Sequence, residues 1–165
     1  MTALLAIENT PDLDQPIGLP EELFSELYFR HASVAGFQPG ESVKGRVLLY
    51  GILLPSGAEC CLAFANAISG SEEAFTILMN RKAEELGMKN TRFANSTGLH
   101  EEGLYSTAED ISLLLAYALG NEEFRKVFTT SRYTTSPSDI HPDGITFTSS
   151  MFQSLDSASV PGGEI

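Results

Sequence analysis

Long apolar runs and basic residues are both scarce in this 165-residue sequence. No window approaches the roughly 18 consecutive apolar residues that a membrane-spanning helix needs. The N-terminus also lacks the basic segment and the small-residue cleavage site of an export signal. Lys and Arg total 10 against 22 Asp and Glu, so the formal net charge is -12. A surface of this sign repels phosphate backbones and anionic lipid head groups, and the sequence predicts no nucleic-acid partner and no membrane segment.

Cysteine and histidine are also rare. Cys60 and Cys61 are neighbours in an apolar run, which is poor geometry for a disulfide and lacks the spacing of a metal site. His31, His100 and His141 have no metal-ligating partner at helical or loop spacing. We therefore predict two buried thiols, three solvated histidines, no metal and no cofactor.

The sequence has the length of one domain. Because 42% of its residues are hydrophobic, it can bury a sizeable core. Apolar residues recur mostly at helical spacing, and turn residues separate the helical stretches. The pattern predicts helices at Thr2 to Glu8, Glu21 to Leu27, Ser42 to Leu54, Gly57 onward, Ser71 to Gly87 and Ser106 to Gly120, and strands near Arg30 to Ala35, Tyr133 and Phe147.

Several short patterns favour helix starts and turns over chemistry. Ser71 precedes two acidic residues that suit a first helical turn, and Ser106 with Glu109 forms a capping-box pattern. We interpret the acidic pairs at 101–102 and 109–110 as helix-entry and surface charge. The Asn-Ser-Thr triplet at Asn95 has the form of a glycosylation sequon, but a turn is the better interpretation.

One polar break separates two apolar runs in the middle of the chain. It reads Pro55-Ser56-Gly57-Ala58-Glu59. Ser-x-x-Glu is a capping-box pattern, so Ser56 is expected to cap a helix that starts at Gly57 while Pro55 ends the helix before it. A catalytic role for Ser56 needs further evidence.

That evidence is a resemblance. The stretches MTALLAIE, LLYGILLPSGAE and GSEEAFTILMNRKAEELGMKNTRFANSTGLHEEGLYSTAEDISLLLAYAL are together similar to the serine D-alanyl-D-alanine carboxypeptidases, which are low-molecular-mass penicillin-binding proteins. The resemblance implies an α+β fold of the beta-lactamase and DD-peptidase type. These enzymes carry three motifs around one cleft: Ser-x-x-Lys, Ser-x-Asn and Lys-Thr-Gly.

By this resemblance Ser56, Gly57 and Ala58 occupy the second motif. A serine alcohol is a weak nucleophile near its free pKa, so a lysine must take its proton, and a second hydroxyl relays that proton to the departing D-alanine. The resemblance gives this relay to Ser56, with Gly57 and Ala58 beside the substrate. Ala58 replaces the motif Asn that bonds the substrate amide, and such a bond is worth about 0.5–1.5 kcal/mol.

The other two motifs do not occur. The residues three positions before the four lysines are Glu41, Met79, Leu86 and Glu123, and no lysine precedes Thr-Gly or Ser-Gly. The start resembles the part of the family's nucleophile helix after Ser-x-x-Lys, and the Gly-Gly tail resembles the approach to Lys-Thr-Gly. We therefore interpret residues 1–165 as a partial carboxypeptidase domain, inactive alone, with most of the antiparallel sheet missing.

Two functions of different class stay open. The first is a serine carboxypeptidase that trims peptidoglycan stem peptides ending in D-Ala-D-Ala, with beta-lactams as ligands of the intact parent and the extracytoplasmic cell envelope as its location. The second is a catalytically dead module that binds peptidoglycan peptide or a partner protein through the same groove. The serine beta-lactamases, which share the fold and the motif order, are the alternative family.

Overall fold

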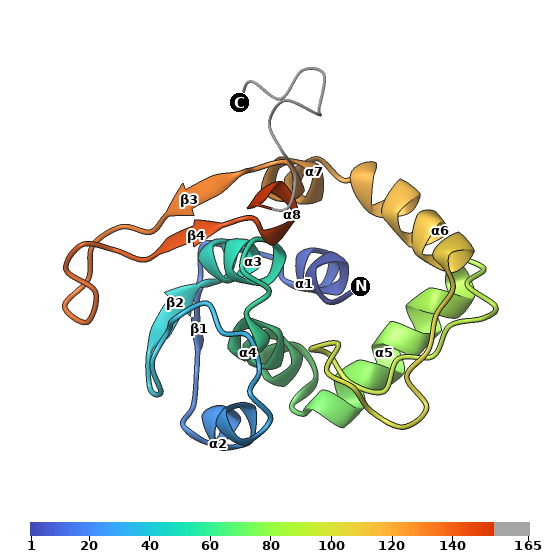
Figure 1. Cartoon of the computed structure of the whole chain (residues 1–165), viewed down its shortest axis with the longest axis horizontal. Helices are drawn as coiled ribbons and strands as arrows, with labels where there is room; N and C mark the ends of the chain where they lie inside the picture. The colour runs from blue at the N-terminus through green and yellow to red at the C-terminus, as the bar shows by residue number, and fades with distance from the viewer. Residues whose placement is uncertain (154–165) are drawn as a thin grey trace.

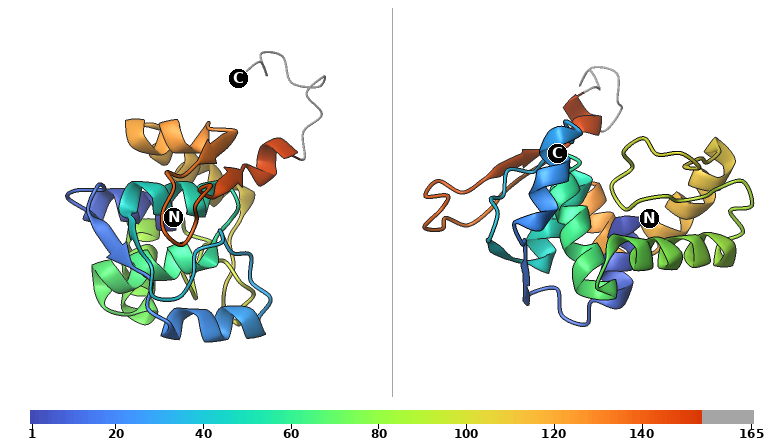
Figure 2. Two further views of the ribbon diagram at one scale, coloured as in Figure 1. Left: turned by 90° about the vertical axis from the view of Figure 1, so that its left-hand side faces the viewer. Right: turned by 90° about the horizontal axis from the view of Figure 1, so that it is seen from below.

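The structure is a computed structural model that describes residues 1–153. Figure 1 shows α3, α4 and α1 at the centre, two small two-stranded sheets on one side, and α5 and α6 on the other, and Figure 2 shows the same elements from two further sides. The elements are α1 (Thr2–Asn9), β1 (Pro16–Gly18), α2 (Glu22–Phe29), β2 (Ser42–Lys44), α3 (Gly45–Leu53), α4 (Ala58–Ser69), α5 (Glu72–Glu85), α6 (Ala108–Leu119), α7 (Glu122–Phe128), β3 (Arg132–Thr134), β4 (Thr146–Thr148) and α8 (Ser150–Gln153). The Gly-Gly segment near the C-terminus lies outside the described residues.

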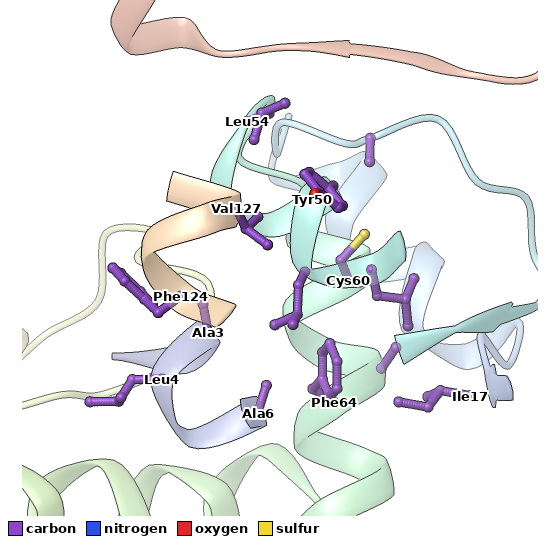
Figure 3. Packing of buried hydrophobic residues seen from close by; sticks show 14 of the residues in the cluster. Ala3, Leu4, Ala6, Ile17, Tyr50, Leu54, Cys60, Phe64, Phe124 and Val127 are labelled. Atoms are coloured by element: carbon purple, nitrogen blue, oxygen red, sulfur yellow. The ribbon is translucent and has the colours of Figure 1, made fainter. Parts of the chain in front are cut away.

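Helix α4 is the centre of the packing, because it contacts α1, α2, α3 and α5. Its Phe64 and Cys60 are fully buried, and Figure 3 shows them beside side chains from α1, α3 and β1. Val127 of α7 closes the same cluster. Burying a large apolar side chain contributes about 1.5–3 kcal/mol, so this cluster fixes the position of the α4 N-terminus. The prediction that both cysteines are buried is confirmed.

The sheets are small within residues 1–153. Strands β1 and β2 pair antiparallel with Ile17 opposite Val43, and β3 and β4 pair antiparallel with Tyr133 opposite Phe147. The Tyr133 ring also stacks on Tyr50 of α3 at a centroid distance of 3.9 Å, which attaches the second sheet to the helices. The predicted strands at Tyr133 and Phe147 and the mixed α+β class are therefore confirmed.

One predicted helix start and one predicted strand are wrong, although the helix predicted to end near Leu54 is present as α3. Ser42 does not cap a helix: it begins β2, and α3 starts at Gly45 without a side-chain cap. The segment from Arg30 to Ala35 forms no strand. In both places pairing with a distant segment decided the local structure, since β2 pairs with β1 and residues near Ala35 bond to α4.

The predicted N-cap residue is correct for α5 and is one residue too early for α6. Ser71 caps α5 and accepts a hydrogen bond from the Ala74 N–H at 3.2 Å. For α6 the cap is Thr107, one residue beyond the predicted Ser106, and it accepts from the Asp110 N–H at 3.2 Å. Ser106 instead bonds Thr91.

Of the polar side chains predicted at the surface, Asp110 is buried and His141 is half-buried. Asp110 is buried and accepts hydrogen bonds from the Asn90 N–H and the Thr91 hydroxyl, each at 2.7 Å. His141 bonds the buried Glu41 carboxylate at 2.8 Å and meets the Phe37 ring edge-on. Each serves as a long-range connection, which sequence spacing does not reveal.

Candidate active site

A cavity of about 500 Å³ lies among α1, α3, α6, α7 and the loop of residues 93–104. Its walls are mainly apolar and include Leu114 and Leu115 of α6 and Ile52 of α3. The polar residues of the lining are Thr2, Ser56, Asn95, Ser96 and Thr97. A mostly apolar cavity with a few convergent polar groups is the usual form of a small-molecule site.

Ser56 faces this cavity from the turn between α3 and α4. Its backbone is left-handed, with φ 62°, which is uncommon for a residue with a Cβ and costs about 1–2 kcal/mol. Helix α4 begins two residues later, and its N-cap is Gly57 without a side-chain cap. The predicted capping box is therefore wrong. Among the described residues no group bonds the Ser56 hydroxyl.

Gly57 and Ala58 lie behind Ser56 and are both buried. The Gly57 N–H donates to the Gly51 carbonyl at 2.8 Å, and the Ala58 N–H donates to the Ser33 carbonyl at 2.9 Å. A Cβ on Gly57 would lie 2.8 Å from the Ala35 Cβ, so no side chain fits there. Of the three residues that the sequence resemblance assigns to the second motif, Ser56 alone lines the cavity.

The loop opposite Ser56 is organised by Asn95. Its Oδ1 accepts from the Gly98 N–H at 2.7 Å and from the Thr97 hydroxyl at 3.2 Å, and its Nδ2 donates to the Leu99 carbonyl at 2.8 Å. This is the local bonding by which asparagine forms turns. The prediction of a turn at Asn95 is confirmed.

Two helices anchor that loop through Ser96. The Ser96 N–H and hydroxyl both donate to the Glu72 carboxylate of α5, at 2.8 and 2.5 Å. The Thr2 hydroxyl of α1 donates to the Ser96 carbonyl at 2.6 Å. The sequence does not indicate these partners, because only the Asn-Ser-Thr-Gly turn pattern marks this loop and nothing in that pattern points to α1 or α5.

The described lining carries no Asp, Glu, Lys, Arg or His side chain. Burial raises the pKa of the Cys61 thiol to about 12 and lowers the pKa of the Met1 amino group to about 6. Both groups are therefore mostly neutral at pH 7. This part of the cavity offers hydroxyls, amides and apolar surface, and residues 1–153 hold no cluster of three or more residues able to ligate a metal.

Solved structures with the same fold are DD-peptidases. A mutant of the Streptomyces K15 DD-transpeptidase superimposes with a TM-score of 0.83 at 26% identity, covering 90% of this chain and 61% of that one. Penicillin binding protein 5 from Haemophilus influenzae gives a TM-score of 0.76 at 22% identity, over 89% of this chain and 42% of that one. The fold thus defines the class as DD-peptidase-like.

Residues 1–149 match the family model described as D-alanyl-D-alanine carboxypeptidase, and the chain belongs to this family. A Bacillus subtilis carboxypeptidase of this name is 46% identical over 99 residues, which are 58% of this chain and 25% of that relative. One from Streptomyces sp. is 32% identical over 141 residues, 81% of this chain and 48% of that relative. The chain thus spans less than half of each. The resemblance stated from the motifs is confirmed.

Proposed function

We propose that this chain is part of a serine-type D-alanyl-D-alanine carboxypeptidase domain that trims peptidoglycan stem peptides outside the cytoplasm. The observation that carries the proposal is that Ser56, which we propose as the serine of the second motif, faces the cavity from a left-handed turn. Family membership over residues 1–149 supports the reaction type. Beta-lactams, which resemble the acyl substrate, are proposed ligands of the complete domain.

Ser56 is proposed to relay a proton. In acyl transfer the serine of a Ser-x-x-Lys motif attacks the scissile carbonyl, a base takes its proton, and the departing amine needs a proton in return. A hydroxyl can accept and donate at once, and the Ser56 hydroxyl has no bond to a described residue that would hold it in another direction. Gly57 and Ala58 are proposed to shape the backbone beside the substrate.

The test compares two proteins. The first is the 165-residue chain. The second, called the extended protein, is the same chain with the residues added that its own locus encodes directly upstream and downstream. Release of D-alanine from a peptide ending in D-Ala-D-Ala is expected for the extended protein alone. In that protein Ser56→Ala should lower turnover by about 10²- to 10⁴-fold, the usual worth of one proton-transfer group.

The matched control is Ser25→Ala, which removes the same hydroxyl from the exposed surface of α2. It should leave turnover unchanged. Full activity of the Ser56→Ala protein would show that Ser56 shapes the turn and nothing more. An extended protein that binds the peptide without releasing D-alanine would favour the binding-module function, and penicillin hydrolysis would favour a beta-lactamase.

A further inference from the structure

Glu59 is a buried carboxylate in the first turn of α4. Its Oε1 accepts hydrogen bonds from the Ala35 N–H at 2.6 Å and from the Gly36 N–H at 3.0 Å. Its Oε2 has no hydrogen-bond partner among the described residues, and no cation of this part of the chain pairs with it. Burying such a group is costly, so the contacts that it does make must be strong to hold it.

Those contacts fix the segment that supports the Ser56 turn. Residues 33–36 pack directly on this turn, since the Ser33 carbonyl accepts from the Ala58 N–H and Ala35 lies against Gly57. Glu59 holds the same segment from the other side. The chain is therefore clamped to the start of α4 at Ser33, at Ala35 and at Gly36.

Ser56 needs such a clamp. A non-glycine residue with φ 62° is strained, and strained backbone persists only where its surroundings leave no relaxed alternative. Without the support of residues 33–36, Ser56 is free to relax toward negative φ, which redirects its side chain. The direction of the Ser56 hydroxyl thus depends on a carboxylate three residues further along.

We propose that Glu59 is a positioning residue for Ser56: by holding the backbone N–H groups of residues 35 and 36, it keeps the left-handed turn that presents the Ser56 hydroxyl to the cavity. The inference rests on the proposed relay function of Ser56. It assigns Glu59 no contact with substrate. Its consequence is that the charge state of Glu59 is coupled to the geometry of Ser56.

The coupling can be observed because burial raises the pKa of Glu59 above its ordinary value, although the N–H bonds oppose the shift. The other titratable groups that interact with it are the thiols of Cys60 and Cys61, whose pKa values are also raised by burial. Thiols lose their protons well above the carboxyl range. The Met1 amino group, whose pKa burial lowers to about 6, lines the same cavity as Ser56. A titration is therefore assigned to Glu59 only where residues 36 and 56 share its midpoint and where it is lost in Glu59→Gln.

The experiment is a pH titration of the 165-residue chain followed by NMR. The Glu59 carboxyl ¹³C, the Gly36 amide and the Ser56 Cβ signals should shift with one shared midpoint, above the midpoint of an exposed glutamate. In Glu59→Gln, which keeps an acceptor oxygen but cannot titrate, the Gly36 and Ser56 titrations should disappear. In Glu59→Ala, which removes the acceptor, amide exchange at Ala58 should accelerate by about tenfold, the loss of one to two hydrogen bonds.

Glu73→Gln is the matched control, because Glu73 is also a first-turn glutamate, in α5, but is exposed. It should leave all three titrations in place. A Ser56 signal that does not follow the Glu59 midpoint in the unaltered chain would overturn the proposal, and this readout needs no variant to fold. So would a Ser56 titration that survives in Glu59→Gln.

A second readout separates this inference from the proposed function. In the extended protein, Glu59→Ala should lower kcat by about tenfold or more with little change in KM, because a positioning residue for a proton relay acts on the reaction step. Glu59→Gln, which keeps the acceptor oxygen, should retain most of the activity. A variant in which KM rises while kcat stays unchanged would overturn the positioning role. If the unaltered extended protein releases no D-alanine, the proposed function fails, while the NMR titration still decides the link between Glu59 and Ser56.

Discussion

Gly57 is a position of the candidate site that has no room for a side chain. Its φ of -69° is open to any residue, so the requirement for glycine is steric and not conformational. A Cβ there would meet the Ala35 Cβ at 2.8 Å and the Gly51 carbonyl oxygen at 2.9 Å. Two segments from different parts of the chain therefore converge on this one position.

Gly57→Ala should destabilise the chain by about 1–3 kcal/mol, the usual cost of overpacking, because backbone atoms on both sides must move. Gly18→Ala is the control, since nothing lies within 4 Å of a Cβ at that position. It should change stability by less than about 0.5 kcal/mol. Urea denaturation followed by circular dichroism measures both, and equal stability of the two variants would contradict the packing described.

The residue scale is also where sequence interpretation was weakest. Ser56 could be singled out because a polar break between apolar runs is visible in the sequence. Glu59 was taken as half of a capping box, although its carboxylate turns away from the helix to the backbone at 35 and 36. A local pattern contains no information on a partner that lies 23 or 24 positions away, and the same limit hid the bond between Glu72 and Ser96.

Among the elements, helix starts were predicted well where the cap is local. Ser71 was identified correctly, and at α6 the choice between neighbouring Ser106 and Thr107 was wrong by one residue. Both residues suit a cap chemically, and the hydrogen bond of Ser106 to Thr91 settled the choice. The short strands β1 and β2 were missed because three-residue strands carry too few alternating side chains to show a period.

Thr107→Ala should lower the free energy of unfolding by about 1 kcal/mol, because the Asp110 N–H loses its acceptor at the first turn of α6. Thr107→Ser keeps a hydroxyl cap and should recover most of the loss. Ser106→Ala serves as the neighbouring control and should cost only a few tenths of this, since its bond to Thr91 is exposed. A larger effect at Ser106 than at Thr107 would place the cap at the predicted residue after all.

For the whole molecule, fold and family were predictable because the resemblance extends through most of the chain, and residues 1–149 match the family. Helix α4 with its buried Phe64 sets the centre around which the other elements pack. No helix within residues 1–153 has the length and hydropathy to span a bilayer. The arrangement of the cavity was not predictable, since its lining comes from segments near both ends of the described chain.

The 165-residue chain should form no covalent adduct with penicillin, because it contains no Ser-x-x-Lys sequence to provide an activated nucleophile. Intact-mass spectrometry after incubation with penicillin checks this, with the extended protein as the positive control. A stable adduct at any serine of the chain would contradict the interpretation of these residues as a partial domain without the nucleophile motif, and an adduct at Ser56 would also contradict its proposed role as a relay.

The loop opposite Ser56 is closed at its base by an antiparallel bridge, in which Arg92 and Tyr105 exchange both backbone hydrogen bonds at 2.9 and 3.1 Å. Segments joined at the base in this way tolerate changes of length and sequence between their ends. The outer part, residues 100–103, bears none of the Asn95 and Ser96 anchors, and its own tie is Arg30, which donates to the His100 carbonyl at 2.7 Å. None of residues 100–103 lines the cavity, so their sequence can differ between homologous carboxypeptidases without changing the walls to which Ser56 and residues 95–98 belong.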